Sequence, residues 1–404
     1  MDPIAGVRRL AELADRPLPE SDPVLVGRIG AEIAERGPMT FDRFMEIALY
    51  DAERGYYATD AARAGRQGDF LTAPEAHPIF GRTLARTVGE AWRALDRPSR
   101  FQLREDGAGE GALAVGMLEG LRTDDPDAFD AVRYRPVEVN PHRMSELQSG
   151  LQRANLEGHL LDPDAPAPRV GIAIANEFLD ALPVHRVEIR DGVLRELFVD
   201  VADKAGRAAG TFVERSLAPS TPRLAARLET EGVQLAEGAR GEICLRIDDW
   251  AAELEGAFDR GFAVVIDYGH PAEDLYSPQR AEGTLRVYSG HRVGSDPFRS
   301  IGRQDLTAHV DFTAVGLAFE RVGWRALGMT TQAEFLVRSG MAEVLQALQA
   351  DPTTDLQERL LLRSAVGRML DPRATGGFRV LVAAKGVPAD TTVAGLQYRA
   401  KQAG

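Results

Sequence analysis

The chain has 404 residues, 44% of them hydrophobic, with a formal net charge of −13 and a pI near 5.2. This length predicts one large α/β domain with additions or two domains, while the acidic balance argues against a sequence-independent nucleic-acid binder, which needs a basic surface. The single cysteine, Cys244, excludes an internal disulfide framework and a cysteine-rich metal site.

The N-terminal part is expected to be helical. Ser21 and Pro23 predict the start of one helix, and Thr40 is a candidate cap for a second. The adjacent Tyr56 and Tyr57 indicate either a packed loop or an aromatic wall over a ligand. Asp69 lies in a polar segment before the next helix, where it either begins a turn or places a carboxylate against a ligand.

The stretch FQLREDGAGEGAL, residues 101–113, predicts a strand, a glycine-rich turn and a helix. Gly107, Gly109 and Gly111 allow a sharp turn and a ligand lying directly against main-chain N–H groups. Glu105, at the strand's carboxyl end, is placed to accept from a ligand's amine or hydroxyls. The spacing differs from the dinucleotide fingerprint and suits a nucleoside with an amino-acid tail, such as S-adenosylmethionine. The alternative is an ordinary glycine-rich loop.

Two further strands end in polar residues. Residues 134–139 are a candidate strand, and Glu138 falls near its end, where an acidic residue can bind ribose hydroxyls or simply face solvent. Residues 170–175 predict a buried strand that is followed by Asn176, Glu177 and Asp180. These three polar groups lie at the edge where parallel sheets bind ligands, although they also fit an ordinary helix cap.

The second half of the chain predicts a hairpin, more core strands and a helical stretch. Asp191-Gly192 favours the tight turn of a hairpin over residues 185–199. Residues 261–266, 324–329 and 378–384 are candidate strands. His270, His291 and His309 do not have metal-ligand spacing and are expected to be buried and hydrogen-bonded.

These patterns predict an α/β protein with four segments. Residues 1–95 form an N-terminal helical region covering the cofactor site, and residues 96–183 form the first part of a Rossmann-like domain. Residues 184–259 are an inserted substrate or partner subdomain that begins with the hairpin, and residues 260–404 complete the Rossmann-like domain. No apolar run approaches the ~18–20 residues of a membrane span, and the N-terminus lacks a signal-peptide core. We therefore expect a soluble, cytoplasmic protein without membrane insertion.

Six motifs in one order carry a resemblance: GPMTFDRFMEIALYDAERGYYA, GDFLTAPE, EDGAGEG, NEFLDALPV, DYGH and RQDLTAHVDF. With them the sequence resembles the mitochondrial-dysfunction-protein-A type methyltransferases, whose mitochondrial members assist assembly of respiratory complex I. The resemblance runs from about Val24 to Lys385. It implies a seven-strand class I fold that uses S-adenosylmethionine and methylates an arginine side chain of a protein.

The resemblance also implies roles for single residues. Gly107, Gly109 and Gly111 would line the methionine moiety, Glu138 would bind the ribose, and Asp69 would complete the cofactor pocket. Asn176, Glu177 and Asp180 would face the acceptor, with Asn176 also within reach of the cofactor. Two carboxylates depart from the family pattern, Asp106 in place of an apolar residue and Glu110 in place of a basic one. We expect them to weaken binding of a cofactor that carries its own carboxylate.

The acceptor stays open at this point. A guanidinium would be held by carboxylates such as Glu177 and Asp180. A hydroxyl or carboxylate on a small molecule would need a general base, for which His309 and His270 are candidates. A natural-product methyltransferase and an inactive assembly scaffold of the same fold are therefore alternatives. Aromatic residues near Tyr56 and Trp250 look exposed and leave room for a homodimer.

Overall fold

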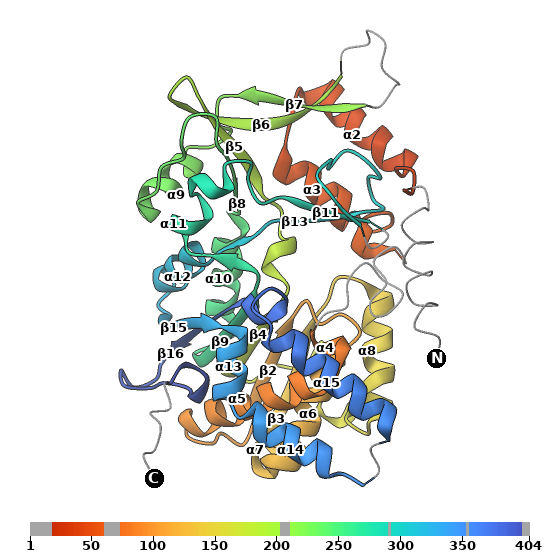
Figure 1. Cartoon of the computed structure of the whole chain (residues 1–404), viewed down its shortest axis with the longest axis vertical. Helices are drawn as coiled ribbons and strands as arrows, with labels where there is room; N and C mark the ends of the chain where they lie inside the picture. The colour runs from red at the N-terminus through yellow and green to blue at the C-terminus, as the bar shows by residue number, and fades with distance from the viewer. Residues whose placement is uncertain (1–17, 60–72, 203–210, 290–291, 353–354, 398–404) are drawn as a thin grey trace. The chain divides into compact units, whose positions relative to one another are not determined.

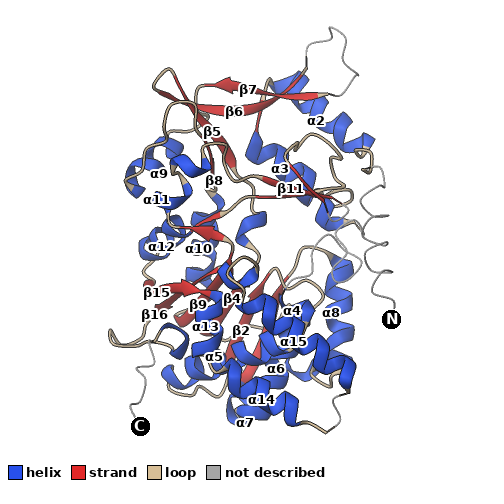
Figure 2. Ribbon diagram, viewed as in Figure 1, coloured by secondary structure: helices blue, strands red, loops and turns tan. Residues whose placement is uncertain are grey.

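The computed structural model describes residues 18–59, 73–202, 211–289, 292–352 and 355–397. They form two compact units. Unit 1 takes its described residues from 1–71, 180–247 and 270–314, and unit 2 from 72–179, 248–269 and 315–404. Both units contain helices and strands (Figure 2). Among the described residues, no helix is both long and apolar enough to cross a lipid bilayer. The four-segment division expected from the sequence stays a prediction.

Unit 2 is built on a six-stranded sheet whose strand order is β15-β16-β9-β4-β2-β3 (Figure 1). The strands β3, β2, β4 and β9 are parallel neighbours, and β16 runs antiparallel between β9 and β15. Ligands bind beyond the carboxyl ends of the strands in such open sheets. The strand bounds are β2 Phe101–Asp106, β3 Val132–Val137, β4 Val170–Asn176, β9 Arg260–Asp267, β15 Arg325–Thr331 and β16 Arg379–Lys385.

Helices cover both faces of this sheet. Side chains of β2 alternate, so Phe101 and Leu103 join the core that α5 and α6 complete, while Arg104 and Asp106 face α10. The helices of this unit are α4 Ala73–Ala76, α5 Ile79–Ala94, α6 Ala112–Asp124, α7 Pro126–Ala131, α8 Pro141–Arg153, α10 Arg246–Ala257, α12 Phe312–Arg321, α13 Gln332–Arg338, α14 Met341–Ala350 and α15 Leu356–Leu370. Helices α10 and α12 have their first residues in unit 1. Short 3-10 turns are η4 Glu157–His159, η7 Thr375–Gly377 and η8 Ala394–Leu396.

The seventh strand expected from the family resemblance is not found among the described residues. Beyond β3, the next chain segment makes only one isolated parallel bridge, between Tyr134 and Leu160. The edge position of β3 also accommodates Pro136, which lies inside the strand but cannot donate to a ladder. Sequence patterns placed this strand at 134–139, two residues too far along, so Glu138 follows the strand instead of belonging to it.

Unit 1 contains a five-stranded sheet of order β1-β6-β5-β8, with β7 paired to β6, and a three-stranded sheet of order β12-β11-β13. The hairpin of β5 and β6 turns at Asp191 and Gly192, both with positive φ, as predicted. The elements of unit 1 are α2 Pro23–Arg36, β1 Met39–Thr40, α3 Phe41–Tyr50, η1 Tyr56–Ala58, η5 Leu179–Ala181, β5 His185–Arg190, β6 Val193–Val201, β7 Phe212–Leu217, α9 Arg223–Glu231, β8 Arg240–Ile243, β10 Gly269–His270, α11 Ala272–Leu275, η6 Pro278–Arg280, β11 Arg286–Ser289, β12 Arg292–Gly294, β13 Asp305–Thr307 and β14 Val310–Asp311.

The expected start of the first helix is confirmed, and one expectation about aromatic residues is corrected. Helix α2 begins at Pro23, and its cap is Asp22, whose carboxylate accepts from the N–H groups of Val24 and Leu25. Tyr56 and Trp250, which looked exposed, are 3% and 6% exposed. The aromatic surface suggested for a homodimer is therefore part of the interior in each unit, and this argument for a dimer is removed.

Helices α5 and α6 pack against each other in unit 2 (Figure 1), and glycines at their contact allow a close approach. A Cβ added at Gly120 would lie 2.6 Å from Ala85 Cβ and 3.0 Å from Arg82 Cα. By contrast, a Cβ at Gly316, within α12, would meet nothing within 4 Å. Glycine costs a helix roughly 0.5–1 kcal/mol relative to alanine, so the two sites separate packing from helix propensity.

We predict that Gly120→Ala lowers the free energy of unfolding by about 1–3 kcal/mol, because the helices must move apart. Gly316→Ala should raise it by roughly 0.5–1 kcal/mol through helix propensity alone. Urea denaturation monitored by circular dichroism measures both. Equal effects at the two sites would contradict the close approach of α5 to α6.

Candidate functional site

The carboxyl edge of the sheet in unit 2 brings together several of the residues singled out from the sequence. The loop 107–111 follows β2, Glu138 follows β3, and Asn176 ends β4, with Glu177 directly after it. Within this unit the parallel register places these strand ends at one edge. The edge is therefore the candidate site, in the position expected for an open α/β sheet.

The glycine loop is fixed by hydrogen bonds inside the protein. The N–H groups of Gly107 and Ala108 donate to the carbonyl of Val137, at 2.9 and 3.3 Å. The N–H of Gly109 donates to Glu138 Oε2 at 2.9 Å. The expectation that these N–H groups are directed at a ligand is therefore corrected, because they anchor the loop to the end of β3.

Gly109 and Gly111 differ in what surrounds them. Both have positive φ, 52° and 84°. A Cβ at Gly111 would lie 2.8 Å from Leu147 Cγ, so this glycine is required for packing against α8. A Cβ at Gly109 would meet nothing within 4 Å. Gly109 thus presents bare backbone to open space, as a close-approach ligand site needs.

Glu138 bridges two backbone groups. Besides accepting from Gly109, its Oε1 accepts from the N–H of Asn140 at 2.8 Å. Asn140 in turn caps α8, since its Oδ1 accepts from the N–H groups of His142 and Arg143. The half-buried Glu138 carboxylate therefore couples the glycine loop to the start of α8. Contact with a ribose stays a prediction.

Glu105 is a buried carboxyl group beside the loop. It is 3% exposed, and Tyr134 Oη donates to its Oε2 at 2.7 Å. Burial raises the pKa of Glu105 to about 8 despite the tyrosine bond, and the nearby Asp106 and Glu138 carboxylates add to the shift. In the free protein at neutral pH, Glu105 thus carries a proton. An ammonium group nearby would favour its ionised form.

The turn after β4 has an unusual backbone. Glu177 has φ 49°, in the left-handed region that non-glycine residues adopt rarely and at some cost. Its N–H donates to the carbonyl of Ile266 at 2.9 Å, and its Oε1 accepts from Asn176 Nδ2 at 3.4 Å. Asn176 Oδ1 is buried and has no hydrogen-bond partner among the described residues. An amide oxygen in that state fits a ligand that brings an N–H or O–H donor.

Two residues that sequence reasoning did not assign to the site organise this turn. Asp267, fully buried, accepts from the N–H groups of Phe178 and Leu179 with Oδ2, at 3.2 and 3.1 Å. Phe178 in turn lies against the glycine loop, because a Cβ at Gly107 would come 3.1 Å from Phe178 Cδ2. An acidic residue at the carboxyl end of the buried strand β9 was the available signal for Asp267.

The two carboxylates that depart from the family pattern do not crowd the loop. Asp106 Oδ1 accepts from Arg104 Nε and Nη2, at 2.9 and 2.7 Å, and its Oδ2 accepts from Trp250 Nε1 at 3.3 Å. Burial alone would lower the pKa of Arg104, but the Asp106 carboxylate raises it, so the guanidinium stays charged. Glu110 is exposed. The expected weakening of cofactor binding thus loses its reason, and so does the argument from these residues for an inactive scaffold.

The other candidate residues belong to unit 1 or lie outside the described residues. Asp180 is buried, and its carbonyl accepts from the Ala308 N–H at 2.9 Å. The ring of His309 stacks on that of His270 with centroids 5.5 Å apart. Burial, with the charges of His270 and Arg286 adding to it, lowers the pKa of His309 to about 4. His309 is therefore a much weaker base than expected. Asp69 and His291 lie outside the described residues.

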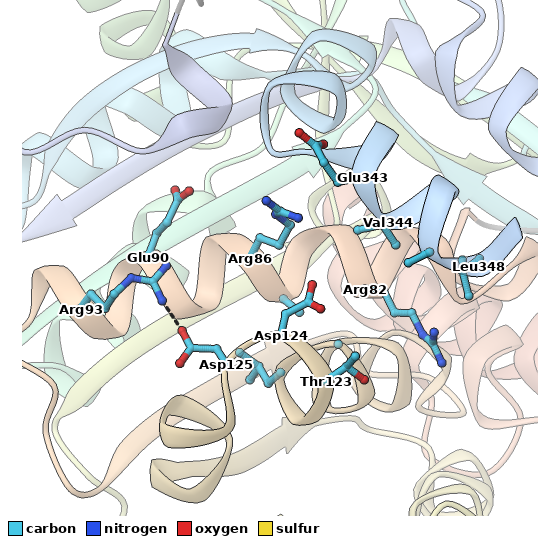
Figure 3. Close-up of a pocket in the computed structure, with 14 residues that line it drawn as sticks. Arg82, Arg86, Glu90, Arg93, Thr123, Asp124, Asp125, Glu343, Val344 and Leu348 are labelled. Atoms are coloured by element: carbon cyan, nitrogen blue, oxygen red, sulfur yellow. Dashed lines mark hydrogen bonds and ion pairs between the residues drawn. The ribbon is translucent and has the colours of Figure 1, made fainter. Parts of the chain in front are cut away.

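Unit 2 also contains a cavity of about 580 Å³ (Figure 3), and none of its lining residues belongs to this edge. Arg82, Arg86 and Arg93 of α5 line one wall, and α14 lines another. Its remaining wall is the carboxyl end of α6, whose amino end follows the glycine loop. Arg93 is paired with Asp125, and Arg82 with Glu119. This cavity is consequently not the candidate site.

Comparisons with known proteins give a consistent picture. The model of a family described as "Putative S-adenosyl-L-methionine-dependent methyltransferase" matches residues 83–330. A Drosophila melanogaster protein named protein arginine methyltransferase NDUFAF7 homolog, mitochondrial, is 31% identical over 87% of this chain and 82% of its own length. The Homo sapiens protein arginine methyltransferase NDUFAF7, mitochondrial, is 26% identical over 89% of this chain and 83% of its own.

Solved structures extend the comparison to three dimensions. A Burkholderia thailandensis protein bound to S-adenosyl-homocysteine superposes with a TM-score of 0.83 at 33% identity, covering 94% of this chain and 97% of the other. A native structure of a protein from the same organism gives a TM-score of 0.80 at 32% identity over the same shares. The chain therefore belongs to the family of S-adenosyl-L-methionine-dependent methyltransferases that includes the NDUFAF7 proteins.

Proposed function

We propose that this methyltransferase transfers a methyl group to a guanidinium nitrogen of an arginine side chain in a protein acceptor. The observation that carries the proposal is the Glu177 carboxylate, held in a left-handed turn at the carboxyl edge of the sheet, one residue before the phenylalanine that contacts the glycine loop. The names of the curated relatives, which are protein arginine methyltransferases, support the same acceptor class.

The residues of unit 2 fit S-adenosyl-L-methionine. The ligand is a nucleoside with an amino-acid tail and supplies a methyl group activated by its sulfonium. Gly109 offers bare backbone, Asn176 Oδ1 is a buried acceptor that needs a donor, and Glu105 is a buried carboxyl group next to the loop. In the proposal, these groups bind and orient the cofactor. Glu138 acts on the loop by holding the Gly109 N–H.

The charge of the Glu177 carboxylate supports a guanidinium as the methyl acceptor. A carboxylate can hold two N–H groups of a planar guanidinium in charge-assisted hydrogen bonds, which fixes the orientation of the third nitrogen. In the transfer, the bond from carbon to the acceptor nitrogen forms, the bond from carbon to sulfur breaks with its electron pair left on the sulfur of S-adenosyl-homocysteine, and the nitrogen releases a proton to water. Alignment and exclusion of water supply most of the rate enhancement in such a displacement. Asp180, three residues after Glu177 in the chain, stays a predicted second carboxylate.

We predict that Glu177→Gln abolishes arginine methylation while cofactor binding is kept. The amide retains the shape but loses the charge that holds the guanidinium, so initial rates should fall about 100-fold or more. The assay follows tritiated methyl transfer from S-adenosyl-L-methionine into a lysate of cells that lack the protein, with labelled residues identified by mass spectrometry. Glu110→Gln, an exposed change in the same unit, is the control.

Label on arginine side chains, lost in Glu177→Gln only, is the expected result. Label confined to the small-molecule fraction would overturn the protein acceptor. Full arginine methylation by Glu177→Gln would overturn the role of this carboxylate and leave the acceptor class standing.

Gly109→Ala should weaken binding of S-adenosyl-homocysteine by about 10-fold or more, equivalent to ~1.4 kcal/mol, because the methyl group occupies the surface that the ligand approaches. The protein has room for the methyl group itself. Gly323→Ala is the matched control, since Gly323 also has positive φ, 81°, and open space around it. Titration calorimetry gives the affinities. Equal affinity of both variants for the ligand would exclude Gly109 from the cofactor surface.

Cofactor binding should release about one proton at pH 7. The pKa of Glu105 is about 8 in the free protein, so its carboxyl group is mostly protonated. The ammonium group of the ligand would lower that pKa and drive the proton into solution. Calorimetry in buffers of different ionisation enthalpy measures the release, and Glu105→Gln should abolish it. Identical proton release by the variant would place the ammonium away from Glu105.

A further inference from the structure

A buried ion pair lies on the face of β2 opposite Glu105. Arg104 is 4% and Asp106 1% exposed, and Arg104 Nη2 also donates to Glu253 Oε1 on α10 at 2.7 Å. Both buried charges are compensated, since each Asp106 oxygen accepts a hydrogen bond. Asp106 Oδ2, the oxygen that does not accept from Arg104, accepts from the indole N–H of Trp250 at 3.3 Å.

The indole connects this ion pair to the site. The ring of Trp250 lies against that of Phe178 with centroids 6.1 Å apart, and against that of Phe319 at 5.5 Å. Phe178 contacts the glycine loop at Gly107 on one side. Its own N–H is held by Asp267. A continuous series of contacts therefore leads from Asp106 through Trp250 and Phe178 to the loop.

We propose that Asp106, by binding the indole N–H of Trp250, positions Phe178 and with it the glycine loop and the turn that carries Glu177. Asp106 and Trp250 are positioning residues in this proposal and touch neither cofactor nor acceptor. The proposal rests on the glycine loop as the cofactor surface. It gives the carboxylate at position 106 a function in ordering the site.

Phe178 lies where it can affect both the glycine loop and the turn that carries Glu177. It follows Glu177 directly in the chain, so a shift of its ring moves the strained turn. Its ring also packs tightly against the backbone of the loop, since a Cβ added at Gly107 would lie only 3.1 Å from Phe178 Cδ2. Because packed side chains interdigitate with few gaps, a rotation of the Trp250 indole would be transmitted to Phe178. Loop and turn are thus ordered by one aromatic contact.

A matched pair of tryptophans allows the test. Trp324 is 1% exposed and packs on Phe319 and Phe258, in the same aromatic group as Trp250. Its Nε1 is buried without a hydrogen-bond partner among the described residues. Trp250→Phe and Trp324→Phe therefore make the same chemical change, but only the first removes a bond to a carboxylate. Asp106→Asn tests the carboxylate from the other side.

The first measurement is the affinity of the full-length protein for S-adenosyl-homocysteine by calorimetry. We expect Trp250→Phe and Asp106→Asn each to weaken binding about 10-fold, equivalent to ~1.4 kcal/mol, and the double variant to be no weaker than either single one. Trp324→Phe should bind like the unchanged protein. Additive losses in the double variant, or equal losses in Trp324→Phe, would overturn the coupling.

The second measurement is amide hydrogen exchange of the ligand-free protein, which a loss of global stability alone would not localise. Faster exchange in the peptides that contain 107–111 and 176–179 is expected in Trp250→Phe and Asp106→Asn, and not in Trp324→Phe. Exchange that rises uniformly would overturn positioning in favour of a purely structural role.

The two proposals can fail separately. If the unchanged protein does not bind S-adenosyl-homocysteine, the cofactor surface itself is wrong and this inference falls with it. If the unchanged protein binds and all three variants bind equally well, the cofactor surface stands and the positioning role of Asp106 is wrong.

Discussion

The carboxylate of Asp267 is the interaction on which the candidate site most depends. Where β4 ends, the backbone leaves the sheet, and its N–H groups lose their ladder partners while still inside the protein. Asp267 accepts from Phe178 and Leu179 in this turn, and also from Tyr268, which follows β9. The residue directly before these anchored N–H groups is Glu177, whose backbone is left-handed. A strand end thereby becomes a rigid support for a charged side chain.

The pleat of β2 gives two neighbouring acidic residues different surroundings. Glu105 and Asp106 are both almost fully buried, yet they point to opposite faces of β2. Glu105 meets a tyrosine hydroxyl and keeps its proton, whereas Asp106 meets a guanidinium and an indole and is paired. Two acidic residues in adjacent positions therefore differ in their partners, since one keeps a proton beside the glycine loop and the other is held in an ion pair on the opposite face of the strand.

Local patterns predicted much of unit 2, because each signal lies within a few residues. The strand, glycine turn and helix around 101–121, the hairpin at Asp191-Gly192 and the cap at Asn140 all follow from spacing and turn chemistry. What could not be predicted depends on partners distant in the chain. Trp250 lies in a helix with many charged residues and looked exposed, but Asp106, 144 positions away, accepts its N–H. The seventh strand, which is not found in the part of the chain that the structure describes, likewise depends on how one segment pairs, and periodicity does not determine this.

The position of β16 in the sheet has a consequence for synthesis of the chain. This strand, residues 379–385 of 404, fills the gap between β9 and β15 and is hydrogen-bonded on both sides. Until it emerges from the ribosome, two partly apolar strand edges have no native partner, and they can pair with other chains. The sheet of the nascent protein therefore stays open until β16 has been synthesised. Chaperone binding during that interval would protect the same two edges.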